Sequence, residues 1–101
     1  MSVGHVVVTT LPVGAVATGR LLIVEDDDSI RDTVGEALKA EGYEVLSSAN
    51  GKEALSLLTD ASAQPVDLLV LDLMLPGLGG LDLCRELRRF NNNTPILVIS
   101  A

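Results

Sequence analysis

Apolar and polar residues alternate in blocks along the chain, and the spacing within each block distinguishes two kinds of element. Short apolar runs predict buried strands, because strands that are covered on both faces are apolar throughout. Longer stretches with apolar residues three or four positions apart predict helices. The predicted strands span residues 20–24, 43–48, 66–71 and 95–100, and the predicted helices begin near residues 28, 50 and 81.

Residues that favour helix ends and turns separate these blocks. We expect Asp28 or Ser29 to cap the first helix and Gly42 to end it, because glycine adopts the left-handed conformation at a helix C-terminus without strain. Asn50 or Gly51 is expected to begin the second helix. The apolar face predicted for the third helix consists of three residues: Leu83, Leu87 and Phe90.

The regular alternation of strands and helices predicts an α/β fold. In this class a doubly wound parallel sheet carries helices on both faces, joined by right-handed crossovers. The sequence ends directly after the apolar run "ILVI", which is expected to need a covering helix. We therefore expect residues 20–101 to form a partial domain. Residues 1–19 precede it as a leader that is poorly ordered or forms an extra edge strand.

Acidic residues follow two of the predicted strands. Glu25 and Asp26 come directly after the first strand, and Asp72 comes directly after the third. Open parallel sheets bind ligands at the carboxyl ends of their strands, where the strand order reverses. If these strands are neighbours, three carboxylates converge, and two unit charges ~5 Å apart repel by roughly 3 kcal/mol at an effective dielectric of ~20. A hard cation, Mg²⁺ or Mn²⁺, would neutralise such a cluster.

Asp72 is the stronger candidate for a nucleophile. It lies between the apolar run "LLVL" and the glycine-rich segment 75–80, whose amides can approach a ligand closely. A carboxylate beside a metal ion suits phosphoryl transfer, because its oxygen can attack phosphorus. Asp27 and Asp28, by contrast, are expected to be acids of a helix start, which interact favourably with the helix dipole.

Composition limits the range of functions. The 101 residues are 48% hydrophobic, which suits one domain at most with a buried core. A net charge of -7 and only two aromatic residues argue against nucleic-acid binding by this segment. No apolar run is long enough to span a membrane. The single cysteine, Cys84, cannot form an intrachain disulfide and fits a reducing, cytoplasmic compartment.

Other functions remain open on these residues alone. A phosphohydrolase with an aspartyl nucleophile would carry a second acid two residues after Asp72, where this chain has Met74. A calcium-binding loop would require a glycine at its sharp turn, which "DDDSIRDTVGE" lacks. The chain could also be an interaction fragment that is not phosphorylated.

Three blocks of the sequence together resemble the receiver domain of two-component response regulators. They are "LLIVEDDDSIR", "DLLVLDLMLPGLGGLDLCRELR" and "TPILVISA", which occur in the expected order within residues 20–101. The resemblance implies a flavodoxin-like receiver fold that here lacks its last helix, strand and helix. It implies a phosphoacceptor module rather than an enzyme. Its phosphoryl group would come from a sensor histidine kinase, and its output would be transcription through a winged-helix DNA-binding domain in the full-length protein.

The resemblance also assigns roles to single residues. Asp72 would be the phosphoacceptor, and Ser100 the hydroxyl that hydrogen-bonds the phosphoryl group and moves on activation. The family's lysine at the end of a fifth strand has no match, because Lys39 and Lys52 are the only lysines and lie too early. The Mg²⁺ ligands implied by the resemblance are Glu25, Asp26, Asp72 and the backbone carbonyl of Met74.

We expect the chain to self-associate, because a strand at residues 95–100 without its covering elements exposes an edge that can pair with a second copy. Light scattering should detect a dimer or larger oligomer in concentrated solution. A monodisperse monomer at high concentration would contradict this expectation.

Overall fold

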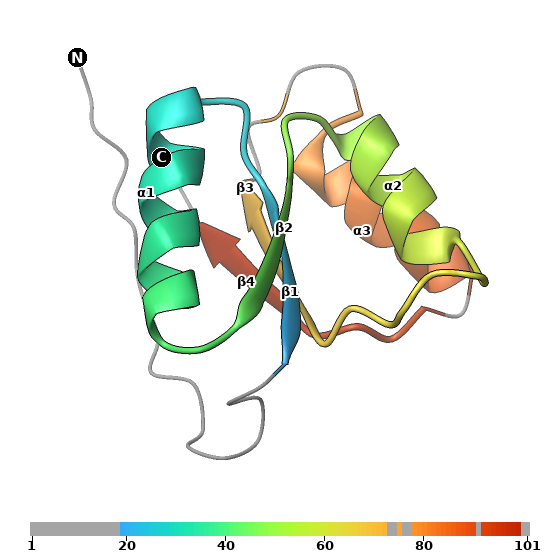
Figure 1. Cartoon of the computed structure of the whole chain (residues 1–101). Helices are drawn as coiled ribbons and strands as arrows, with labels where there is room; N and C mark the ends of the chain where they lie inside the picture. Colours follow the sequence, from blue (N-terminus) through green and yellow to red (C-terminus); the bar gives the residue numbers. More distant parts are fainter. Residues whose placement is uncertain (1–18, 73–74, 76–77, 91, 100–101) are drawn as a thin grey trace.

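The computed structural model describes residues 19–72, 75, 78–90 and 92–99. Within these residues strands and helices alternate along the chain, as the sequence pattern predicted (Figure 1). Residues 1–18 of the expected leader lie outside the described part. The elements are β1 (Arg20–Val24), α1 (Asp28–Ala40), β2 (Glu44–Ser48), α2 (Gly51–Thr59), β3 (Leu68–Asp72), α3 (Gly80–Arg89) and β4 (Ile96–Ile99).

The four strands form one parallel sheet in the order β2-β1-β3-β4. The chain leaves β1 toward β2 on one side and then crosses to β3 on the other side, so the strand order reverses between β1 and β3. Helix α1 covers one face of the sheet, and α2 and α3 cover the other (Figure 1). This arrangement confirms the doubly wound α/β class.

Apart from Arg20 at the start of β1 and Asp72 at the end of β3, the residues of these two strands are all apolar, because each strand face meets a helical layer. Leu22 and Leu71 belong to the cluster that packs against α2 and α3. Their neighbours Ile23 and Val70 belong to the cluster that packs against α1. Both faces of the two central strands are therefore core, which explains why no polar residue interrupts them before their carboxyl ends.

Most element ends agree with the sequence pattern, and the differences have local causes. Asp27 caps α1, rather than Asp28 or Ser29, because its side chain accepts the backbone N–H of Ile30 at 2.9 Å. Gly42 has a φ of 99°, as expected of a helix-ending glycine. Asn50 caps α2 and accepts the N–H of Glu53 at 2.8 Å.

Two further boundaries differ from the prediction. Strand β3 begins at Leu68 instead of residue 66, because Asp67 turns its carboxylate back to accept the backbone N–H of Arg20 at 2.8 Å. Phe90 was expected on the buried face of the third helix but is 61% exposed. Helix α3 ends at Arg89, so Phe90 lies at its C-cap, where the backbone leaves the helical path.

The exposed edge expected on the last strand is consistent with the described residues. Strand β4 lies at one end of the strand order, and its Val98 is 40% exposed. Self-association through this edge stays a prediction.

Replacing Leu71 with alanine should lower the free energy of unfolding by about 2 to 5 kcal/mol, because its side chain is fully buried and a cavity would remain. Leu81→Ala is the matched control: its side chain is 59% exposed, so the change should stay within about 0.5 kcal/mol. Urea denaturation measures both. Equal effects would contradict the observed position of the core.

Candidate metal centre

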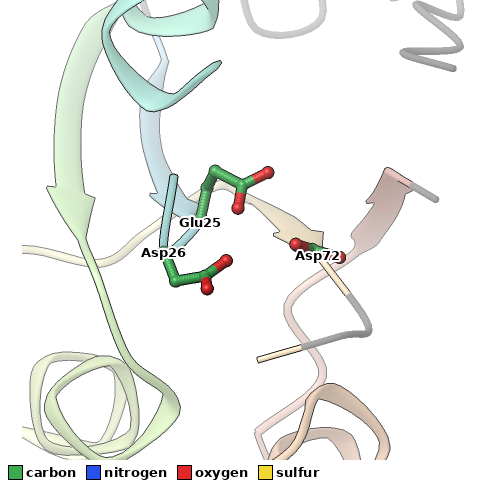
Figure 2. A group of neighbouring side chains, drawn as sticks. All are labelled: Glu25, Asp26 and Asp72. Atoms are coloured by element: carbon green, nitrogen blue, oxygen red, sulfur yellow. The ribbon is translucent and has the colours of Figure 1, made fainter. Parts of the chain in front are cut away.

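The acidic residues lie where two neighbouring strands end. Strands β1 and β3 are parallel and paired so that Val24 lies opposite Leu71. Glu25 and Asp26 follow β1, and Asp72 is the last residue of β3, so all three emerge at the same edge of the sheet. In Figure 2 the carboxylates of Glu25 and Asp26 extend toward the side on which Asp72 lies.

The three carboxylates are close enough to share one ion. Each offers an oxygen atom, and these three oxygens all lie within 4.8 Å of one another. Glu25 and Asp72 are 3% and 6% exposed, whereas Asp26 is exposed to solvent. The group therefore combines two buried acidic residues with one that is exposed to solvent.

Glu25 is held by its backbone as well as its side chain. Its N–H donates to the carbonyl oxygen of Ser48, at the end of β2, at 3.1 Å. Its carbonyl accepts the guanidinium Nη1 of Arg31 at 2.9 Å. Its side-chain oxygen accepts the backbone N–H of Asp27 at 3.1 Å. These bonds fix Glu25 from β2, from α1 and from the turn between β1 and α1.

Burial raises the pKa of Glu25 to about 7, from a usual value of 4.5. The N–H of Asp27 lowers this pKa, whereas the neighbouring carboxyls of Asp26 and Asp72 raise it further. Near neutral pH a proton on Glu25 therefore competes with a cation for the same site.

Arg31 and Ser48 were not anticipated from the sequence. Arg31, on α1, also forms an ion pair with Asp28. The hydroxyl of Ser48 donates to the carbonyl of Asn50 at 2.9 Å, next to the start of α2. No spacing pattern connects these residues to Glu25, because their contacts depend on how α1 and β2 pack beside β1.

The other acids of the "EDDD" run have the structural roles expected of a helix start. Asp27 is the N-cap of α1, and Asp28 pairs with Arg31 in its first turn. Met74 and Ser100, to which the resemblance gave roles, lie outside the described residues.

The donor set fits a hard divalent cation. All three side chains offer carboxylate oxygens, which Mg²⁺ prefers, and the exposure of Asp26 leaves room for water as further ligands. The ionised carboxylates also attract a positive ion to the position between them.

Within the described residues, no helix has both the length and the apolar character required to cross a membrane.

Comparison with known families agrees with this geometry. The family model described as "Response regulator receiver domain" matches residues 21–101. A probable transcriptional regulatory protein of Picosynechococcus sp. is 49% identical over 86 residues, which are 81% of this chain and 34% of the relative. The alkaline phosphatase synthesis transcriptional regulatory protein SphR of Synechococcus elongatus is 43% identical over 92% of this chain and 38% of its own length. The chain thus spans about a third of the length of such relatives.

Solved structures resemble the fold closely. A Francisella response regulator receiver domain has a TM-score of 0.77 and 32% identity, over 83% of this chain and 67% of its own. The receiver domain of the Arabidopsis thaliana histidine kinase CKI1, complexed with Mg²⁺ and BeF3-, has a TM-score of 0.74 and 30% identity, over 81% of this chain and 65% of its own. A complex of the histidine kinase ThkA with the response regulator TrrA matches with a TM-score of 0.72 and 36% identity, over 83% of this chain and 70% of the matched chain.

The raised pKa of Glu25 predicts a stability that falls as the pH rises. Between about pH 4.5 and pH 7 the folded state keeps the proton that the unfolded chain has lost, so the folded state binds more protons. The metal-free protein should therefore lose up to about 3 kcal/mol of unfolding free energy across this window. Urea denaturation at several pH values, with a chelator present, measures the loss.

Glu25→Gln should remove this component, because the amide keeps the shape and an acceptor oxygen but has no proton to lose. Glu53→Gln, at an exposed position in the first turn of α2, is the control and should leave the pH dependence unchanged. A Glu25→Gln profile that falls as steeply as that of the unsubstituted protein would contradict the prediction.

Proposed function

This chain belongs to the response regulator receiver domain family, and from that premise we propose that Asp72 accepts a phosphoryl group from a sensor histidine kinase in a Mg²⁺-dependent reaction. The observation that carries the proposal is the convergence of Asp72 with Glu25 and Asp26, within 4.8 Å, at the edge where the strand order reverses. This edge is the usual ligand position of an open parallel sheet.

Asp72 is the best nucleophile among the three carboxylates. One side-chain oxygen of Glu25 already accepts the N–H of Asp27, which leaves it less available as a nucleophile. Asp26 is exposed to bulk water. Asp72 is the last residue of the buried strand β3, is only 6% exposed, and is paired in register with Ile99 of β4. A buried strand end gives its backbone a defined position, which favours an oriented attack.

The transfer forms one bond and breaks another. A carboxylate oxygen of Asp72 attacks phosphorus, and the bond from phosphorus to the ring nitrogen of the kinase's phosphohistidine breaks. The leaving imidazole takes the electron pair, and Asp72 becomes an acyl phosphate. Bound Mg²⁺ would supply positive charge near the phosphoryl oxygens.

Four residues are proposed to hold Mg²⁺. The side chains of Asp26 and Asp72 would coordinate it directly, and Glu25 would act through a water molecule. The remaining ligand is the carbonyl of Met74, and it stays a prediction from the family resemblance. So does the role of Ser100 as the hydroxyl that hydrogen-bonds the phosphoryl group.

The proposed partner is a histidine kinase in the cytoplasm. The complex of TrrA with ThkA supports this partnership, since TrrA resembles this chain. The free cysteine Cys84 fits a reducing compartment.

Relatives named as transcriptional regulators support control of transcription as the output. That output would require a part of the protein that corresponds to the remaining two thirds of these relatives.

Incubating the protein with acetyl phosphate and Mg²⁺ should add one phosphoryl group, detected by intact-mass measurement. Asp72→Ala should abolish the addition because it removes the attacking oxygen, and a chelator should abolish it in the unsubstituted protein. Asp82→Ala is the control: Asp82 lies on the exposed face of α3, so labelling should persist.

Two outcomes would contradict the proposal. Labelling of Asp72→Ala equal to that of the unsubstituted protein would place the acceptor elsewhere. Sustained multiple turnover of a generic phosphate ester, lost in Asp72→Ala, would instead favour a phosphohydrolase.

A further inference from the structure

A backbone contact connects the start of α2 to the segment that follows Asp72. Gly51 is the first residue of α2 and is buried. A Cβ atom placed on Gly51 would lie 2.5 Å from the carbonyl oxygen of Leu78, and 3.4 Å from its carbonyl carbon and its Cβ. The first distance is far below van der Waals contact, and the atom in the way belongs to the backbone. Any side chain at Gly51 would therefore have to move either α2 or the Leu78 segment.

A second buried glycine shows that this crowding is specific to Gly51. Gly35 lies in the middle of α1. A Cβ on Gly35 would be 3.7 Å from Cδ1 of Ile23 and 3.9 Å from Cγ1 of Val45, which is ordinary side-chain contact. Alanine should fit at Gly35 but not at Gly51, although both residues are helical and buried.

The Gly51 contact completes a series of contacts around the acidic group. Glu25 bonds to the carbonyl of Ser48, and the hydroxyl of Ser48 bonds to Asn50, which caps α2. Gly51 follows Asn50 and packs against Leu78, in the segment that joins β3 to α3. The end of β1 is thus connected through Ser48 to Asn50, and Leu78 contacts the next residue, Gly51.

We propose that Gly51 is a positioning residue: its bare Cα lets the Leu78 carbonyl pack against the start of α2 and so fixes the position of Leu78, six residues after Asp72 in the chain. A displaced Leu78 should in turn displace the backbone of Asp72, to which it is connected through the chain. Because a misplacement of about 1 Å can cost roughly 100-fold in rate, such a displacement should slow phosphoryl transfer strongly. The effect on rate rests on the proposed phosphoacceptor function, whereas the effect on the segment does not.

Gly51→Ala and Gly35→Ala form a matched pair that tests the inference. In ¹⁵N-labelled protein without ligand, Gly51→Ala should shift the amide resonances of Asp72 and Leu78, and Gly35→Ala should leave them in place. Phosphorylation by acetyl phosphate should be at least about tenfold slower in Gly51→Ala and unchanged in Gly35→Ala. A Mg²⁺ titration followed through the same amides measures metal affinity separately from rate.

The outcomes separate the two proposals. If the unsubstituted protein is not phosphorylated, the proposed function fails, and the shifts at Asp72 and Leu78 still decide the role of Gly51. A folded Gly51→Ala protein with unchanged resonances and an unchanged rate overturns the inference. Equal effects of Gly51→Ala and Gly35→Ala overturn it too, because they would indicate a general loss of packing.

The Asp72→Ala variant of the phosphorylation experiment provides a second measurement if Gly51→Ala does not fold. If the Leu78 segment connects the two positions, Asp72→Ala should shift the amides of Leu78 and Gly51 while leaving that of Gly35 unchanged. An Asp72→Ala spectrum in which Leu78 shifts and Gly51 does not would overturn the inference.

Discussion

Mutual repulsion among the carboxylates of Glu25, Asp26 and Asp72 is the constraint that the described part of the chain has to satisfy. Their oxygens lie within 4.8 Å of one another, where two ionised groups repel by roughly 3 kcal/mol at an effective dielectric of ~20. Burial of Glu25 and Asp72 adds the cost of removing charge from water. Favourable interactions in the rest of the fold must outweigh this unfavourable free energy. Glu25 reduces the repulsion by holding a proton up to a pKa of about 7.

Burial of apolar side chains in the two central strands supplies the larger, stabilising contribution to the folding free energy. Strands β1 and β3 each bury four aliphatic side chains, and fully burying one such side chain contributes about 1.5 to 3 kcal/mol. The sum, before chain entropy is counted, exceeds the repulsion among the three carboxylates even if all three are ionised. Stability and function are therefore separated along the same strands: the apolar residues hold the sheet together, and the residues at its carboxyl edge can carry an unfavourable charge cluster.

The order of elements, and the acids at the ends of β1 and β3, could be predicted because both depend on local patterns. Apolar runs indicate buried strands, and a parallel sheet brings their carboxyl ends to one edge. The contacts of Arg31 with Glu25 and of Gly51 with Leu78 could not, because they depend on how separate elements pack. Phe90 was misplaced for a related reason: helical spacing describes a face only as far as the helix continues, and α3 ends at Arg89.

Under the proposed function, the unequal exposure of the carboxylates meets two opposing requirements. A cation that arrives from water needs an accessible first ligand, and Asp26 is exposed. A signal carried by an acyl phosphate has to persist, and Asp72 is only 6% exposed, so few water molecules can reach a phosphoryl group at its base. A hydrolase with the same nucleophile would instead have to deliver a water molecule to phosphorus. Burial of the acceptor beside an exposed metal ligand therefore suits a module that stores a phosphoryl group better than an enzyme that turns one over.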